Sequence, residues 1–415
     1  MAVIHRIRAI FGDPVLMFTV LGLSIFGVAM IYSAGQLDAA NPAVARVWRM
    51  QLTWLGLSIV LLFIVMRIPV RWLEWIALPS YVIGIAVLLA TLIIGTGAGT
   101  AEGTRSWIRF GSVGVQPSQF ANVATVLMLG RVMGAWRESP QSLIALWKPV
   151  AVVAVPLLLV FAQPDLGTAM VFGGVLIATL YWAGTPLGLL FMLLSPALAL
   201  FIAIIPWLFS IYMLGLLAFL YFYRAYFWEG AVIVIANLAA GTIGKPLWNT
   251  LEEYQKNRLL VFLDPMIDPR GAGYNVIQSK VAIGSGGPFG KGFLDGTQKR
   301  LAFLPEQHTD FIFAVIGEEM GFLFGSLVVI TAYSIILWRL IKLAERIPDP
   351  FAGIVIFGIF GAWFTHIIVN IGMTVGLMPI TGIPLPFLSY GGSFLLATFL
   401  ALGVAQRVAG EQGRI

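Results

Sequence analysis

The sequence of 415 residues contains no cysteine and little charge. The absence of cysteine excludes disulfide bonds, thiolate metal sites and cysteine nucleophiles within the chain. Two motifs of other chemistries are also absent: the nucleotide-binding GxxxxGK[ST] loop and the Gly-x-Ser-x-Gly elbow of serine esterases. No spacing of His, Asp and Glu indicates a dedicated metal site, so the sequence predicts no cofactor bound through a recognisable motif.

Charged residues make up 11% of the sequence and apolar residues 59%, whereas soluble domains are about 25% charged. The apolar excess lies in long runs such as 14–34 and 353–378. Runs of about 20 apolar residues form helices that cross the roughly 30 Å core of a bilayer. The sequence therefore predicts an all-α polytopic membrane protein. Its net charge of +6 is interpreted as the basic excess of cytoplasmic loops, not as a nucleic-acid surface.

About twelve membrane spans are predicted, because each of these segments is long and apolar enough to cross. Lys and Arg in the short loops orient them and place both termini in the cytoplasm. No cleavage site follows the first run, which is expected to remain as a membrane helix. The predicted spans are 14–34, 51–67, 75–96, 118–135, 148–162, 167–184, 187–206, 207–224, 226–244, 311–339, 351–376 and 386–408. The orienting residues are Arg6, Arg8, Arg67, Arg71, Arg131, Arg137, Lys148, Arg339, Lys342, Arg346, Arg407 and Arg414.

The longest predicted loop, 245–310, faces outward and has about 65 residues, where most connections are short. It is rich in Gly and Pro, yet residues 276–283 mix apolar and polar types as an amphipathic segment does. We expect short helices and turns at the membrane surface, with Tyr254, Phe262 and Tyr274 at headgroup depth.

The strongest concentration of reactive side chains lies where this loop re-enters the membrane. Glu306, His308, Thr309 and Asp310 follow Pro305 within six residues. One interpretation is structural, since Thr309 or Asp310 would suit the N-cap of a helix. The other is chemical, because partial burial raises the pKa of a carboxyl group and suits it to proton transfer.

Three further acids, Asp165, Glu318 and Glu319, lie in or at the rim of spans. Carboxylates are costly inside a membrane, so each is expected to be paired or functional. Adjacent Glu318 and Glu319 point about 100° apart on a helix, so at least one needs its own partner. His366 and Asn370 are one helical turn apart, and we expect them to form hydrogen bonds between helices.

Glycine runs at 271–273 and 284–292 flank Lys280 in the long loop. Such runs let backbone amides approach an anion. With Lys291, Arg105 and Arg109 as further outward cations, they suggest a site for a phosphate-bearing lipid.

Several motifs occur together and in one order over about three quarters of the chain. They are RSW at 105–107, QPS at 116–118, QPDLG at 163–167, DPRGAGY at 268–274, QSK at 278–280, GSGG at 284–287, FLPEQHTDF at 303–311, PLP at 384–386 and SYGG at 389–392. In these motifs the sequence resembles the SEDS family (shape, elongation, division and sporulation proteins), most closely its RodA branch.

The resemblance implies a peptidoglycan glycosyltransferase that polymerises lipid II at the outer face of the bacterial cytoplasmic membrane during cell elongation. Asp310 matches the essential aspartate of the family and would be the catalytic base. A divalent cation, Mg²⁺ or Mn²⁺, would help neutralise the departing pyrophosphate. The residues at motif positions that would bind substrate are Arg105, Trp107, Arg109, Gln116, Ser118, Gln163, Asp165, Gln278, Lys280, Glu306, His308 and Thr309. The implied partners are a class B penicillin-binding protein and the elongation machinery.

The sequence departs from the family pattern in two places. Gln119 and Asn122 stand where the RodA branch usually has Glu and Lys. Because both charges are lost together, we expect a neutral amide pair in place of a buried salt bridge. The second departure is length: within the single domain 1–415, residues 207–244 look like a two-span insertion into a bundle of about ten helices. Such a hairpin is expected at the periphery and leaves the sidedness of later spans unchanged.

Three other functions compete with polymerisation in elongation. A lipid II flippase would need polar groups across the whole membrane depth, whereas the richest polar cluster is expected at the outer rim. A non-catalytic scaffold would need Asp310 only for capping. A division protein of the FtsW branch would carry out the same chemistry elsewhere in the cell.

Overall fold

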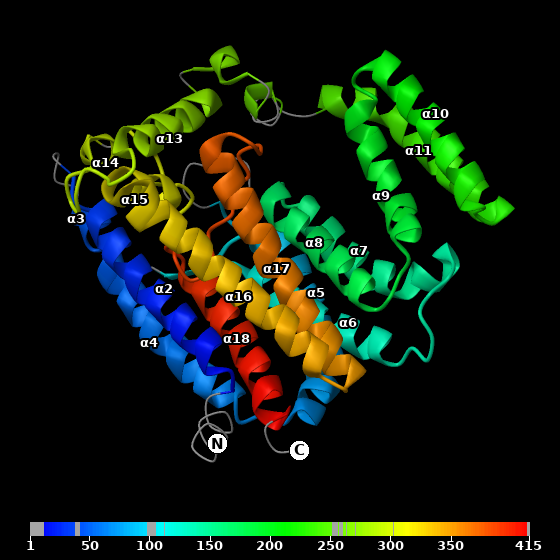
Figure 1. Cartoon of the computed structure of the whole chain (residues 1–415), viewed down its shortest axis with the longest axis horizontal. Coiled ribbons are helices and arrows are strands. Elements are labelled where there is room, and N and C mark those ends of the chain that lie inside the picture. The colour runs from blue at the N-terminus through cyan, green and yellow to red at the C-terminus, as the bar shows by residue number, and fades with distance from the viewer. Residues whose placement is uncertain are drawn as a thin grey trace.

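The computed structural model describes residues 12–37, 42–97, 105–111, 113–250, 256, 260–262, 264–269, 271–301 and 303–412. Within these ranges the chain is a bundle of long helices with one small β-hairpin (Figure 1). Nine of the described helical segments are long and apolar enough to cross a membrane by length and composition. Two shorter apolar helices, α8 and α9, and the more polar α6 complete the twelve predicted spans.

The first half of the bundle follows the predicted spans closely. Its helices begin where a cap and an apolar run coincide: the Asp13 carboxylate accepts the Leu16 amide, and Pro14 opens α2. The elements are α2 (Pro14–Ala34), α3 (Pro42–Ala45), α4 (Val47–Val65), α5 (Val70–Ile94), β1 (Ile108–Phe110), β2 (Val113–Val115), α6 (Pro117–Gly134), η1 (Leu143–Leu146), α7 (Trp147–Phe161), α8 (Leu166–Trp182) and α9 (Leu187–Ile202).

The second half differs from the predicted boundaries in three main places. Helix α11 continues to Thr250, and the span predicted at 311–339 continues to Arg346. The last helix starts at Gly392 because 384–391 is irregular. The elements are α10 (Pro206–Tyr223), α11 (Phe227–Thr250), η2 (Pro265–Ile267), α13 (Ala272–Gly286), α14 (Thr297–Arg300), α15 (Ile312–Gly321), the π-helical turn η3 (Phe322–Ser326), α16 (Leu327–Arg346), α17 (Pro350–Val375) and α18 (Gly392–Gln412). Helices α15 and α16 form one span interrupted by η3.

Helices α17 and α18 form the centre of the bundle, since 78% of the apolar window of each is buried. Helix α17 packs against α6, α8 and α16. Small residues bring the backbones of α8 and α17 together, because a methyl group added to Gly361 would lie 3.0 Å from the Gly174 carbonyl oxygen. The core is thus built from packed small and apolar side chains.

Helices α9, α10 and α11 form a separate group at one edge (Figure 1). Only 6% of the α10 window is buried. Within the group, the Asn237 side chain donates to Ser195 and accepts from Tyr212, each at 2.8 Å. The peripheral position is the one expected for a hairpin added at 207–244, and its origin as an insertion remains a prediction.

The two ends of the described chain lie on the same side of the bundle (Figure 1). The backbone amide of Asp13 donates to Gln406 at 2.6 Å, and the Asp13 carboxylate forms an ion pair with Arg339. The side that carries the two ends also carries Arg339. That the side is cytoplasmic remains a prediction, and His5, Arg6, Arg8 and Arg414 lie outside the described residues.

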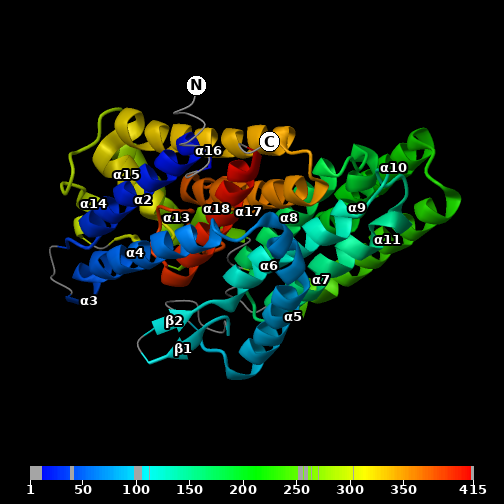
Figure 2. The ribbon, with the colours of Figure 1, turned by 90° about the horizontal axis from the view of Figure 1, so that it is seen from below.

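The two loops predicted to face outward both contain regular structure. Strands β1 and β2 form a hairpin that the sequence did not indicate, and it projects beside α5 and α6 (Figure 2). In the long loop, the amphipathic segment forms α13, which packs against α15 and α17. Phe262 is 38% exposed and Tyr274 is half-buried, whereas Tyr254 lies outside the described residues.

Candidate active site

The loop that carries Asp310 is folded around a single carbonyl group. The Glu306 carbonyl accepts hydrogen bonds from the amides of Thr309 and Asp310 at 3.1 Å and from that of Phe311 at 3.4 Å. Glu306 adopts a left-handed conformation with φ of +49°, which is unusual for a residue with a side chain. Such strain persists where the surrounding structure holds it and is concentrated at functional sites.

Three successive carbonyls of this loop, from residue 308 to residue 310, are bonded to the C-terminal part of the chain. Their donors come from the end of α17 and from the irregular segment 384–391, which brings together two motifs 80 residues apart. The bonds run from the Tyr390 amide to the His308 carbonyl at 2.9 Å, from the Ser389 hydroxyl to the Thr309 carbonyl at 2.6 Å, and from the Asn370 amide group to the Asp310 carbonyl at 2.9 Å.

The helix that follows does not use this cluster as the predicted N-cap. Helix α15 begins at Ile312, its N-cap residue is Phe311, and no side chain at that position forms a capping bond. The expectation of Thr309 or Asp310 as the cap residue is therefore wrong. The Thr309 hydroxyl instead donates to the Glu306 carbonyl at 3.1 Å. Residues 306–311 form a turn, so α15 begins two residues later than a cap at Thr309 would place it.

Two buried apolar side chains anchor the loop on either side of the acidic cluster. Leu304 and Phe311 are 3% and 2% exposed, and both belong to a small core with Val276 of α13 and Met373 of α17. Burying a side chain of this size contributes about 2 kcal/mol. Asp310 itself is half-buried, so its carboxylate lies near the surface on a fixed backbone.

A second acidic group, Asp165, lies on the same side of the bundle. Its carboxylate caps α8 by accepting from the Thr168 amide at 3.0 Å and also accepts from the Gln116 side chain at 3.0 Å. The Gln119 amide group in turn donates to Gln116 at 3.0 Å. The network joins the first turns of α6 and α8, and it connects two of the predicted motif residues, Gln116 and Asp165, with Gln119.

Residues 381–383 lie between this network and Asp310. A methyl group on Gly167 would lie 2.8 Å from the Thr381 carbonyl oxygen, and one on Gly382 would lie 3.2 Å from a carboxylate oxygen of Asp310. Gly382 has φ of +72°, which favours glycine. The absence of a side chain here leaves space beside the Asp310 carboxylate.

The expected amide pair of Gln119 and Asn122 does not form. Gln119 is bonded to Gln116, and the Asn122 amide nitrogen has no hydrogen-bond partner among the described residues. Both side chains line a cavity of about 30 Å³ between α6, α17 and α18, together with His366 and Thr398. A cavity of that size and polarity has room for water, which would satisfy Asn122.

His366 and Asn370 both form hydrogen bonds, but to loop backbone, so the expected bonds between helices are not the ones formed. Asn370 donates to the carbonyls of Asp310 and Ile383, and the His366 ring lies 3.1 Å from the Pro384 carbonyl. These bonds hold the segment that faces Asp310. His366 and Asn370 thus have a positioning role that their helical spacing alone did not specify.

The predicted cations Lys280, Arg105 and Arg109 lie on two different elements, helix α13 and the β1–β2 hairpin region. Lys280 is exposed on α13 and lies against Gly376, at the end of α17. Arg109 of the hairpin donates to the Gly97 carbonyl at 3.2 Å, and Arg105 is exposed. Trp107 pairs with Thr96 in an isolated β-bridge.

The three remaining motif residues lie at buried or half-buried positions. The Gln163 amide group donates to the Leu88 carbonyl at 3.1 Å. Ser118 is fully buried, with no partner for its hydroxyl among the described residues. Gln278 is half-buried on α13, and its neighbour Ser279 ties that helix to the Thr374 carbonyl at 2.7 Å.

The glycine run at 284–292 serves close packing. The amides of Lys291 and Gly292 donate to the carbonyls of Glu318 and Glu319 at 3.0 and 2.9 Å. A methyl group on Gly286 would clash with the backbone of α15. Since these amides are bonded within the protein, they are not available to bind an anion.

Electrostatics in the loop centre on His308. Burial lowers the pKa of its imidazole, and the adjacent Glu306 carboxylate opposes that shift only in part. The ring lies 5.6 Å from that of Tyr390. His308 is therefore neutral at neutral pH. Among the described residues, no group of three or more His, Asp or Glu is placed to hold a metal ion.

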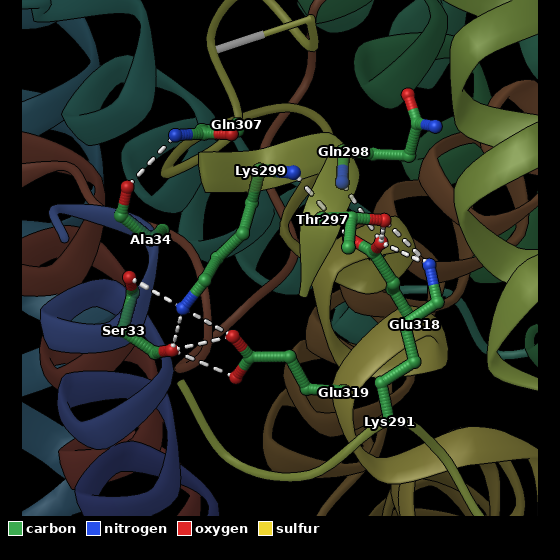
Figure 3. Close-up of polar contacts among 9 residues, drawn as sticks. All are labelled: Ser33, Ala34, Lys291, Thr297, Gln298, Lys299, Gln307, Glu318 and Glu319. Carbon is green, nitrogen blue, oxygen red and sulfur yellow. Dashed lines mark hydrogen bonds and ion pairs between the residues drawn. The ribbon is translucent and has the colours of Figure 1, made fainter. Parts of the chain in front are cut away.

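Both intramembrane glutamates have partners that the sequence did not reveal. Glu318 forms a 2.8 Å ion pair with Lys291, and Glu319 forms one with the fully buried Lys299. Figure 3 shows the two pairs side by side, with Ser33 of α2 between Lys299 and Glu319. The sequence does not single out Lys299, because it lies in a basic, polar stretch of the loop, where exposed side chains are expected.

The chain belongs to the family of FtsW, RodA and SpoVE, which are described as cell cycle proteins. The model of that family matches residues 14–214 and 208–413. The chain is 32% identical to the peptidoglycan glycosyltransferase RodA of Treponema pallidum, over 98% of this chain and all of the relative. It is 33% identical to the peptidoglycan glycosyltransferase MrdB of Escherichia coli K12, over 95% of this chain and 93% of that one.

Solved structures agree with the fold. A chain from a peptidoglycan synthase complex superposes with a TM-score of 0.71 at 27% identity, over 96% of this chain and 98% of that one. The rod shape determining protein RodA of Thermus thermophilus superposes with a TM-score of 0.62 at 23% identity, over 96% and 97%. The helical bundle is thus the fold of a multi-pass membrane protein of this family.

Proposed function

We propose that this chain polymerises lipid II into glycan strands and that Asp310 is the catalytic base. The chain is a glycosyltransferase of the RodA type, as its relatives from T. pallidum and E. coli are peptidoglycan glycosyltransferases. A relative of the FtsW branch from Trichlorobacter lovleyi, a probable peptidoglycan glycosyltransferase, is 33% identical. The same chemistry is therefore expected of both branches, and we propose that this chain acts in cell elongation.

The proposed reaction is a single displacement. The Asp310 carboxylate takes the proton from the 4-hydroxyl of the acceptor GlcNAc as that oxygen attacks C1 of the donor MurNAc. The bond from C1 to the lipid pyrophosphate breaks, and undecaprenyl pyrophosphate leaves with the electron pair. General-base help of this kind is typically worth 10² to 10⁴ in rate.

The observation that carries the proposal is the three-bond attachment of residues 308–310 to α17 and segment 384–391. A base must be held within hydrogen-bond reach of its proton, and an error of about 1 Å can cost ~10² in rate. The attachment fixes the main chain of Asp310, and Gly382 leaves space beside its carboxylate. This is the geometry expected of a rigid base that faces a bulky substrate.

The leaving group carries several negative charges, and outward cations would stabilise it. Lys280 is the best placed of the described candidates, since α13 packs against both α15 and α17. Arg105, Arg109, Trp107 and Gln278 remain proposed contacts for more distant parts of lipid II. A divalent cation carried by the pyrophosphate would serve the same end as part of the substrate.

A flippase is less well supported. The polar residues that meet near Asp310 lie at one end of the helices. We further propose that this end faces outward, that both termini are cytoplasmic, and that a class B penicillin-binding protein and the elongation machinery are the partners.

Purified protein in detergent with fluorescent lipid II tests the function. Polymer formation is expected for the wild type, and near-complete loss for Asp310→Asn, which keeps the shape but cannot accept the proton. Asp310→Glu should retain little activity, because its extra methylene moves the oxygens by about 1 Å. Lipid II binding by each variant is the control. Polymer formation by Asp310→Asn at the wild-type rate would exclude Asp310 as the base.

A further inference from the structure

Lys299 is a charged residue of a surface loop whose side chain is completely buried, with 0% exposure. Its ammonium group forms an ion pair with Glu319 of α15 and donates to the Ser33 hydroxyl at 2.5 Å and the Ser33 carbonyl at 2.9 Å. The Ser33 hydroxyl in turn donates to the Glu319 carboxylate at 2.7 Å. Figure 3 shows this three-residue network. A lysine is almost never buried in this way unless it is paired.

The neighbouring Glu318 holds the backbone of the same short helix. Its carboxylate accepts from the Gln298 amide at 2.9 Å, from the Lys299 amide at 3.4 Å and from the Thr297 hydroxyl at 3.1 Å. The two consecutive glutamates of α15 therefore hold the two ends of one residue, the main chain and the ammonium group of Lys299. Helix α14 is fixed in position and in rotation.

A second anchor follows on the same helix end. The Gln307 side chain donates to the Ala34 carbonyl at 2.8 Å, and Ala34 is the last residue of α2. The last carbonyls of a helix lack partners within it and carry partial negative charge. The Gln307 amide group supplies a donor to the Ala34 carbonyl, and the ammonium group of Lys299 adds one to the Ser33 carbonyl, which also accepts from the Gln36 amide at 3.0 Å. Asp310 lies three residues beyond Gln307.

Helix α2 also supports the other half of the Asp310 site. A methyl group on Gly27 would lie 2.7 Å from the Leu388 carbonyl oxygen, so α2 packs directly against segment 384–391. That segment holds the carbonyls of His308 and Thr309. One helix thus contacts the Asp310 loop, through Gln307, and the segment 384–391 that binds the carbonyls of that loop.

Resting on the function proposed above, we propose that Lys299 is a positioning residue, which fixes the Asp310 loop by binding Glu319 and the C-terminal end of α2. A buried ion pair is seldom the most stable choice, since an apolar pair of similar volume often does as well. The hydrogen bonds of the network are directional, however, and they form only when the loop takes this one position. Its contribution is therefore expected in the rate of the chemical step, beyond any contribution to stability.

The test compares Lys299→Met, the double variant Lys299→Met/Glu319→Gln and the matched control Arg339→Met. Arg339 forms a largely buried ion pair with Asp13, which caps the opposite end of helix α2, far from the Asp310 loop. Melting temperature, kcat and KM for lipid II are measured for each full-length protein, with kcat expressed per folded molecule.

Lys299→Met should lower the melting temperature, because it leaves Glu319 buried without a counter-charge. It should also lower kcat at least about tenfold with little change in KM, since a misplaced base slows chemistry rather than binding. The double variant should have a melting temperature closer to that of the wild type, while its kcat stays low. Arg339→Met should have a lower melting temperature and a wild-type kcat.

A wild-type kcat in the double variant would overturn the positioning role, as would an equal loss of kcat in Arg339→Met or an effect on KM alone. If Lys299→Met does not fold, the double variant decides the question by itself. If the wild-type protein makes no polymer, the proposed function itself is wrong. Polymer from the wild type and unchanged kcat in the Lys299 variants would remove this inference alone.

Discussion

The side-chain amide of Asn370 donates to the backbone carbonyl of Asp310 at 2.9 Å and so joins the C-terminal part of α17 to the proposed catalytic residue. The same amide donates to the Ile383 carbonyl at 2.7 Å. One fully buried side chain thereby fixes two loop segments that face each other across the site. The contact couples the most buried part of the bundle to its outer rim.

Asn370→Leu should therefore impair both stability and catalysis. Each buried carbonyl that loses its donor costs about 1–3 kcal/mol in the free energy of unfolding, and the Asp310 loop loses one of its three attachments. We expect a lower melting temperature and a fall in kcat for lipid II polymerisation. Thr365→Val, which removes a hydrogen bond made within α17 alone, is the control. Equal kcat in the two variants would refute the coupling.

The neutral state of His308 predicts a pH dependence of stability. Because its pKa is lowered in the folded protein, the unfolded chain binds the proton more readily. The free energy of unfolding should be unaffected above about pH 6.5 and should fall as the pH drops from there towards the folded-state pKa. His308→Gln should flatten that part of the stability curve, as measured by thermal unfolding from pH 7.5 to 5.

Protonation of His308 should also affect the rate. A positive charge two residues from Asp310 would stabilise its carboxylate and weaken it as a base. In wild-type protein the polymerisation rate should therefore decrease as His308 becomes protonated, and in His308→Gln the acid limb should move to lower pH. A superimposable acid limb in both proteins would exclude this influence.

The cavity at Gln119 and Asn122 offers a test of charge burial. Gln119→Glu or Asn122→Lys alone places one charge among Trp363, His366 and Thr398, which should cost several kcal/mol in the free energy of unfolding. The double variant can form an ion pair and should be more stable than either single variant. Equal melting temperatures in all three would mean that water in the cavity screens the charges.

Lys280 is the candidate for the pyrophosphate that can be tested most directly. Since the side chain is exposed beside Gly376, Lys280→Ala should leave the melting temperature unchanged. Loss of a cation near the leaving group should lower kcat by about 10 to 10². Lys280→Arg should recover part of the rate. An unchanged rate in Lys280→Ala would remove the residue from the site and leave a lipid-headgroup contact as its role.

The absence of native cysteine allows membrane topology to be tested with single cysteines. Asp295→Cys in the long loop should react with an impermeant reagent added outside the cell, and Glu345→Cys near the end of α16 should not. Both positions are exposed, whereas Ala344 is buried and would be protected in either orientation. Reversed labelling would place Asp310 on the cytoplasmic side and contradict the proposed function.

The sequence by itself determined the helices and the residues of the Asp310 loop. Long apolar runs specify spans because the bilayer removes other ways to satisfy the backbone. Local signals set several ends, as at Asp349 and Pro350, where the carboxylate accepts the Phe351 amide at the start of α17. The cluster at 304–311 stood out because its residues are contiguous, so no knowledge of packing was needed to see it.

The partners of those residues were decided by the tertiary structure. Lys299 and Ser33 are 266 residues apart, and Asn370 and Asp310 are 60 apart. Nothing local in the sequence links such pairs, because their contact depends on which helix ends meet at the outer rim. The same reason explains the amide of Asn122: three-residue spacing places it near Gln119 on α6, but Gln116 competes successfully for the hydrogen bond. Spacing along a helix defines which side chains are neighbours, and packing between helices decides which of them bind.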